Sequence, residues 1–241
     1  MNAIDPWGLD HYIFYDDEHI ANAESLKEQL LENDPDTPVH LIRADTDKDF
    51  YKGWSAMGMD EDGNAVPIDY VLIVVHGKPG YVESSYDQPI YADKLEKKTI
   101  DTVFISACNT GNMDFEDNFA SQLAMSQDVN QVIAPDGYGK YNPTGFPFFS
   151  EYHDDLGVVT GREGNGIIVY QNINGVLVIT TNLEKDRNYK FVPEIIEKGR
   201  AVGAQNRLKA RAEALFSDPG NIPRFPRPDH YNPNPGPFPL R

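Results

Sequence analysis

A histidine and the only cysteine of this chain each follow a short apolar run. His76 comes directly after Tyr-Val-Leu-Ile-Val-Val, and Cys108 comes directly after Thr-Val-Phe-Ile-Ser-Ala. Runs of this kind are typical of strands buried on both faces of a parallel sheet, and ligands bind beyond the carboxyl ends of such strands. If the two strands are neighbours, about 4.8 Å apart, the imidazole and the thiol face one crevice. A thiol beside an imidazole is the core of a cysteine nucleophile system.

Each of the two residues also has an ordinary interpretation. A lone cysteine at a strand end usually serves packing, and a histidine there can simply hydrogen-bond a loop. The equivalent positions of His76 and Cys108 on consecutive strands favour chemistry over packing. Gly77 follows the histidine, where a backbone N–H can approach a ligand without interference from a Cβ atom.

The elements that must position this pair alternate between strands and helices. The 32 positions from His76 to Cys108 suit one β-α-β crossover. The alternation predicts a mostly parallel, right-handed α/β sheet flanked by helices. We expect strands at 11–15, 39–42, 71–75, 103–106 and 131–134, and helices at 22–32 and from Asp114 onward. Residues 43–68 should be mainly loop with a short helix. Residues 77–98 should form a turn and a long loop, followed by a short helix near 92–98.

The rest of the chain predicts three further features. Residues 138–166, rich in glycine, proline and aromatics, predict a long irregular loop, and a β-hairpin with strands at 166–170 and 175–180 follows. Pro193 can start a C-terminal helix that runs to about Phe216, and recurring prolines predict an extended tail. The expected organisation is a junction at 1–10, a main domain at 11–182, a helical segment at 183–216 and a Pro-rich tail at 217–241.

The charge distribution narrows the possible partners. The formal net charge is −17; residues 1–182 carry 10 Lys and Arg against 31 Asp and Glu, whereas residues 183–241 carry 11 against 7. An acidic body argues against binding to nucleic acid or to an anionic membrane. It favours a basic substrate or a basic partner, although the simplest role of such a surface charge is to keep the protein soluble. No run approaches the roughly 20 apolar residues that cross a membrane, and we expect no signal peptide.

The residue inventory predicts no cofactor and no metal site. One cysteine excludes an intrachain disulfide framework and a multi-cysteine metal site, and it fits a reducing compartment. No glycine-rich phosphate loop occurs in the sequence. His153, which stands among the carboxylates of residues 151–155, offers a metal-binding alternative, but we favour a solvated surface there.

The two strand ends resemble those of a known enzyme family. A strand that ends in Val75-His-Gly77, followed by one that ends in Ser106-Ala-Cys-Asn-Thr110, resembles the caspase-like cysteine peptidases, especially the bacterial clostripain and CHAT-type branches. The resemblance covers residues 11–137 and implies a caspase-like fold. It implies that His76 and Cys108 form a catalytic dyad. It also implies that the N–H groups of Gly77 and Cys108 form the oxyanion hole.

Asp136 follows the fifth expected strand, at the same edge of the sheet. By the same resemblance it is a candidate for a substrate-binding pocket that pairs with a basic side chain. The competing interpretation is a turn aspartate, because Pro-Asp-Gly is a common turn tripeptide. The turn interpretation is the simpler of the two.

The amino terminus carries a second resemblance. The segment Asp5-Pro-Trp-Gly-Leu9 resembles the Asp-Pro-x-Gly-Leu motif that closes the core of Rhs-type polymorphic toxins. In those proteins the toxin tip follows the motif and is released from a large shell. The resemblance implies an effector delivered to the cytoplasm of a target cell, with a parent Rhs shell and a cognate immunity protein as partners. An ordinary Asp-Pro turn is the alternative.

Together these patterns predict a cysteine endopeptidase effector that cleaves proteins of a target cell, with a preference for a basic residue if Asp136 lines the pocket. Two rivals stay open. One is a deamidase or acyltransferase that uses the same dyad. The other is an inactive protease-like module that binds a partner, or simply a doubly wound binding domain with an incidental cysteine and histidine.

Overall fold

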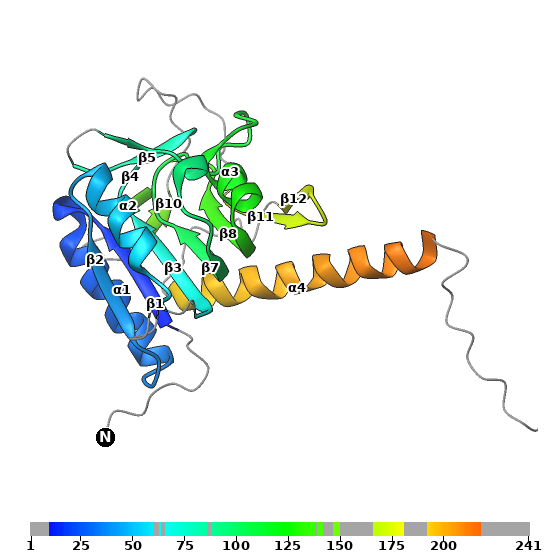
Figure 1. Ribbon diagram of the computed structural model, residues 1–241, viewed down its shortest axis with the longest axis horizontal. Coiled ribbons are helices and arrows are strands. Elements are labelled where there is room, and N and C mark those ends of the chain that lie inside the picture. Colours follow the sequence, from blue (N-terminus) through cyan, green and yellow to red (C-terminus); the bar gives the residue numbers. More distant parts are fainter. Residues whose placement is uncertain are drawn as a thin grey trace, which may run out of the picture.

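The computed structural model describes residues 10–59, 63, 66–85, 88–137, 139–141, 147–149, 166–180 and 192–217. Its centre is a seven-stranded sheet with the strand order β12-β11-β8-β7-β3-β1-β2 (Figure 1). Five neighbouring strands are parallel, and the last two are antiparallel. The predicted mostly parallel α/β sheet with a β-hairpin is thereby confirmed. The strands are β1 (Asp10–Tyr15), β2 (Val39–Arg43), β3 (Ile68–Val74), β7 (Thr99–Ile105), β8 (Asp128–Pro135), β11 (Ile167–Ile173) and β12 (Val176–Thr180).

Helices cover both faces of this sheet, so that the core has two halves. One half joins side chains of α1 (Ile20–Asn33) and α4 (Val192–Ser217) to one face of the strands. The other half joins α2 (Asp47–Ala56) and α3 (Phe119–Ser126) to the opposite face. Strand β3 lies between them and is almost wholly buried, as its unbroken apolar run predicts.

Polar side chains fix where α4 lies on the sheet. Gln171 Nε2 donates to the carbonyl of Gly203 at 3.2 Å, and Asn206 Nδ2 donates to Gln171 Oε1 at 2.8 Å. Arg207 Nη1 donates to Gln131 Oε1 at 3.2 Å. A Cβ atom at Gly203 would lie 2.6 Å from Gln131 Oε1, so the helix backbone itself touches these amides. Beyond this contact, α4 extends past the sheet (Figure 1).

A second, smaller sheet replaces much of the loop that the sequence predicts after His76. Its antiparallel strands are β4 (His76–Lys78), β5 (Tyr81–Glu83) and β6 (Pro89–Ile90). The prediction of a long loop was wrong here because three-residue strands give too little alternation to be recognised. The expected helix near 92–98 is only a 3-10 turn, η2 (Ala92–Lys94).

Of the two helices that cover the second face, one begins later than predicted. Helix α3 begins at Phe119 rather than after Asp114, because the Asn118 side chain accepts a hydrogen bond from Ser121 N and caps the helix there. The short helix expected within 43–68 is confirmed as the ten-residue α2, which begins with a capping box between Thr46 and Asp49.

The later part of the chain follows the prediction where it is described. The hairpin β11–β12 turns at Asn174 and Gly175, both with positive φ, as the Asn-Gly pair predicts. The expected loop over 138–166 contains a small antiparallel pair, β9 (Gly139–Tyr141) and β10 (Pro147–Phe149). Among the described residues, no helix has the length and apolar character to cross a membrane. The Asp5–Leu9 motif, His153 and the tail from Asp218 lie outside the described residues.

Candidate active site

The structure brings the ends of β3 and β7 together. The two strands pair in parallel, with Ile73 opposite Ile105, and Ser106 N donates to the carbonyl of Ile73 at 2.8 Å. His76 stands two residues after β3, and Cys108 stands three residues after β7. Both residues therefore lie at the edge of the sheet where the parallel strands end, which we call the carboxyl rim. The function of the pair stays a prediction.

The backbone of Gly77 packs directly against the backbone of Cys108. A Cβ atom built on Gly77 would lie 2.3 Å from the Cys108 carbonyl oxygen and 2.8 Å from the Cys108 nitrogen. Real Cβ atoms do not approach backbone atoms so closely, so only glycine fits at this position. The residue directly after the histidine is thus in contact with the cysteine.

The pairing of β4 with β5 leaves the Gly77 N–H outside the hairpin. The hairpin closes with Lys78 opposite Tyr81, and Gly77 lies opposite Val82. Because only two residues connect Lys78 to Tyr81, the closing pair is of the hydrogen-bonded type, and the next pair is of the other type. The Gly77 N–H therefore takes no part in the pairing of β4 with β5.

Cys108 stands on a sharp turn held by several hydrogen bonds. Asn109 has a φ of +57°, which is uncommon outside glycine, and its N–H donates to the carbonyl of Gly137 at 2.8 Å. Thr110 Oγ1 donates to the carbonyl of Ala107 at 2.8 Å, and Gly111 N donates to that of Pro135. The thiol-bearing residue is half-buried. A cysteine on such a turn is fixed in place yet still accessible from the rim.

The imidazole of His76 contacts residues that follow β1. Its Nε2 lies 2.9 Å from Oε2 of Glu18, and its ring meets that of His19 edge-on at 5.0 Å between centroids. The side chain of His76 is 45 % exposed. Because β1 pairs in parallel with β3, the residues after both strands share the carboxyl rim. A carboxylate at Nε2 fixes the ring and leaves Nδ1 for proton exchange.

Asp16, the first residue after β1, is fully buried beneath these side chains. Burial alone raises the pKa of this carboxyl group, but the hydrogen bond from His19 Nδ1 at 2.6 Å and the charges of His19 and His76 outweigh it. The pKa of Asp16 is therefore lower than its ordinary value. The Ser85 hydroxyl also lowers it, although neither Ser85 Oγ nor Asp16 Oδ2 has a hydrogen-bond partner of standard geometry.

Asp136 lies at the same rim, directly after β8. Its side chain is buried, and Oδ1 accepts a hydrogen bond from Met113 N at 3.1 Å. The carboxylate also raises the pKa of Tyr170, after the larger effect of that tyrosine's burial. Holding a backbone N–H is what a turn aspartate does. The role of Asp136 in substrate binding stays a prediction.

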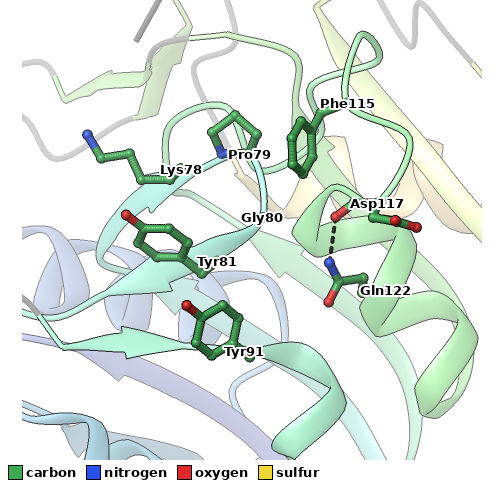
Figure 2. A pocket seen from close by; sticks show the side chains of 8 residues that line it. All are labelled: Lys78, Pro79, Gly80, Tyr81, Tyr91, Phe115, Asp117 and Gln122. Atoms are coloured by element: carbon green, nitrogen blue, oxygen red, sulfur yellow. Dashed lines mark hydrogen bonds between the residues drawn. The ribbon is translucent and has the colours of Figure 1, made fainter.

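A pocket with a volume of about 590 Å³ opens between the segments that follow His76 and Cys108 in the chain. Figure 2 shows the side chains that line it. One wall follows His76 in the chain and the opposite wall follows Cys108. Phe119 N joins the two walls by donating to the carbonyl of Pro79 at 2.6 Å. The lining residues are Lys78, Pro79, Gly80, Tyr81, Tyr91, Phe115, Asp117 and Gln122. Three of these eight residues are aromatic and most of the lining surface is apolar, so the pocket suits an apolar side chain.

The sequence reasoning missed Asp16, Glu18 and His19. The signal was present, because Asp16-Asp-Glu-His19 directly follows the first predicted strand. Applying to this strand the rule that identified His76 and Cys108 would have placed these side chains at the same rim.

A family model described as a domain of unknown function, DUF8616, matches residues 45–148. This range contains His76, Cys108 and Asp136. No curated protein matches the chain.

Proposed function

We propose that this protein is a cysteine endopeptidase of caspase-like fold, with His76 and Cys108 as its dyad. The observation that carries the proposal is the contact between Gly77 and the Cys108 backbone, which places the residue after the histidine against the cysteine. The strand order β2-β1-β3-β7-β8 supports it, since the histidine follows the third parallel strand in the chain and the cysteine the fourth. This arrangement resembles the caspase-like peptidases.

The proposed reaction begins with attack of the Cys108 thiolate on the carbonyl carbon of a peptide bond. The oxyanion that forms accepts hydrogen bonds from the N–H groups of Gly77 and Cys108. His76 protonates the departing amine, and a water molecule then releases the acyl group from the sulfur. Glu18 acts as a positioning residue, because its carboxylate holds Nε2 of the imidazole.

The pocket in Figure 2 is the proposed site for a substrate side chain near the cleaved bond. Its walls continue from the two dyad residues, so a bound peptide would pass between them. An apolar or aromatic side chain fits the rings of Tyr81, Tyr91 and Phe115. A separate preference for a basic residue depends on Asp136, whose carboxylate is buried.

The proposed biological setting is that of a delivered effector. The resemblance of Asp5–Leu9 to the Rhs junction supports a toxin tip that acts in the cytoplasm of a target cell. Such a setting implies a cognate immunity protein, and the acidic body of the chain favours a partner with a basic surface.

The experiment that tests this function compares wild type with Cys108→Ala after expression in bacteria. Mass spectrometry of protein termini should find new termini only with wild type. Mass gains of about one dalton at glutamine or asparagine would instead identify a deamidase, and acyl adducts a transferase. Identical proteomes, together with no labelling of Cys108 by an electrophilic peptide probe, would contradict any catalytic role. The residues before the new termini report directly on the proposed basic and apolar preferences.

We expect Phe115→Ala to raise KM for a good peptide substrate about tenfold with little change in kcat. The ring of Phe115 forms part of the pocket wall and has no group that could take part in the proposed chemistry, so its loss should weaken binding of the substrate side chain only. Steady-state kinetics on peptides found by terminal sequencing provide the measurement. Met125→Ala is the matched control, since Met125 is an exposed apolar residue of α3 outside the pocket. Equal KM values for the two variants would refute the assignment of the pocket.

A further inference from the structure

Three side chains at the carboxyl rim form a group of the composition found in metal sites. Asp16, His19 and His76 each offer one ligand atom, and these atoms all lie within 4.8 Å of one another. Two of the residues come from the segment after β1, and the third follows β3. One carboxylate and two imidazoles are a common ligand set for first-row divalent ions.

The carboxylate of Asp16 is the strongest evidence that this group has a ligand. The residue is fully buried, and only Oδ1 has a hydrogen-bond partner, His19 Nδ1. Oδ2 is buried and makes no hydrogen bond of standard geometry with the described residues, and the same is true of Ser85 Oγ, although this hydroxyl still interacts with the carboxyl group of Asp16. A buried carboxylate oxygen without a partner is costly, and folded proteins satisfy nearly all such atoms. A cation at Oδ2 would remove that cost.

The neighbouring side chains suit a metal ion that exchanges with solvent. His76 is 45 % exposed and Glu18 is 59 % exposed, so an ion can enter from the rim. The carboxylate of Glu18 lies 2.9 Å from His76 Nε2. It is close enough to act as a fourth ligand of the ion, or to orient the His76 ring by a hydrogen bond to the nitrogen that does not bind the ion.

We propose that Asp16, His19 and His76 bind a divalent transition-metal ion, for which Zn²⁺ is the best match, and that this ion inhibits the enzyme. Zinc accepts two imidazole nitrogens and one carboxylate oxygen with an open fourth position. Binding occupies the nitrogen lone pair of His76 and draws its ring toward Asp16. The same imidazole then no longer delivers a proton to a leaving amine. The inhibitory part rests on the proposed function, whereas the binding part does not.

The binding part is tested on full-length Cys108→Ala protein, so that the thiol is not a ligand. Isothermal titration with ZnCl₂ should give one site per chain. We expect His19→Gln and Asp16→Asn each to weaken this site at least about tenfold. His40→Gln is the matched control, because His40 Nε2 also lies 2.9 Å from a carboxylate, that of Asp10, far from the rim. Circular dichroism and thermal melting check that each variant is folded.

Two results would overturn the site. The first is the absence of saturable zinc binding to the folded protein. The second is equal zinc affinity in the His19→Gln and His40→Gln variants. If Asp16→Asn does not fold, the decision rests on His19→Gln. The side chain of His19 is 12 % exposed, whereas that of Asp16 is fully buried, so this substitution should disturb the fold less.

The inhibitory part is tested by labelling the cysteine with an electrophilic peptide probe, with ZnCl₂ or with EDTA. Zinc should suppress labelling of the wild type, and His19→Gln should need at least about ten times more zinc for the same effect. Equal suppression in the two proteins would overturn regulation through this site, because the ion would then act at Cys108 and His76 alone. Failure of labelling in EDTA would refute the proposed function, while the titration would still decide the metal site.

Discussion

Replacing His76 with glutamine is expected to lower kcat/KM for peptide cleavage about 10³-fold, within the range that general acid–base groups contribute. Glutamine keeps a hydrogen-bonding group near Glu18, but its amide cannot accept a proton from a thiol and pass it to a leaving amine, as an imidazole can. The loss should therefore appear mainly in kcat. The assay contains EDTA, so that a metal ion at the rim does not affect the comparison. Steady-state kinetics with a fluorogenic peptide give the measurement.

His40→Gln is the control for this prediction and should keep nearly all activity. His40 is 46 % exposed and its Nε2 lies 2.9 Å from Asp10, so it matches His76 in exposure and in its carboxylate partner. It differs in position, because it lies near the start of β2 and not at the carboxyl rim. Comparable losses in the two variants would mean that His76 acts only through general stability.

A methyl group at Gly77 is expected to abolish most activity and to destabilise the fold. The Cβ of alanine would lie 2.3 Å from the Cys108 carbonyl oxygen and 2.8 Å from the carbonyl carbon of Ala107. These are backbone atoms, so the turn that carries the thiol must move away. Displacing one oxyanion donor costs about 10²- to 10³-fold in kcat, and overpacking of this kind costs about 1–3 kcal/mol. Kinetics and urea unfolding measure the two effects separately.

Gly80→Ala is the stability control for Gly77→Ala, because it places the same methyl group in the same hairpin. There the nearest atom is Cε1 of Phe115 at 3.4 Å, an ordinary contact. The close packing of Gly77 against the Cys108 turn would be contradicted if the two variants had the same free energy of unfolding and Gly77→Ala kept its activity. Loss of activity without loss of stability would still support the placement of the Gly77 N–H.

The fold could be predicted where long patterns exist. The helix at 22–32 has apolar residues at helical spacing, the run before His76 is short and rich in β-branched residues, as in a buried strand, and the Asn174–Gly175 pair specifies a hairpin turn. The β4-β5-β6 sheet could not be predicted, because its strands are too short to show alternation. The start of α3 was misplaced because Asp114 and Asn118 are both acceptable caps, and only the tertiary contact of Phe119 with Pro79 selects the second.

The placement of His76, Gly77 and Cys108 at one rim followed from a general property of parallel sheets. The contacts of His76 did not, because they depend on which strand lies beside β3. The order β7-β3-β1 places Asp16 and Glu18 next to the histidine, although they precede it by about sixty residues. Strand order is a property of the whole packed sheet, and the spacing of residues along the chain does not specify it.

The side-chain amides of Gln131 and Gln171, which contact α4, fix this helix in one register on the sheet. Sliding it by one turn would move Gly203 away from Gln131 and Gln171 and bring a side chain against them, leaving buried amides unpaired. A shifted register would therefore cost hydrogen bonds that the observed one makes, and we expect α4 to associate with the sheet in one register. Truncations that end before Gly203 would then lose the anchor as a unit, while those that remove only the projecting end would leave it intact.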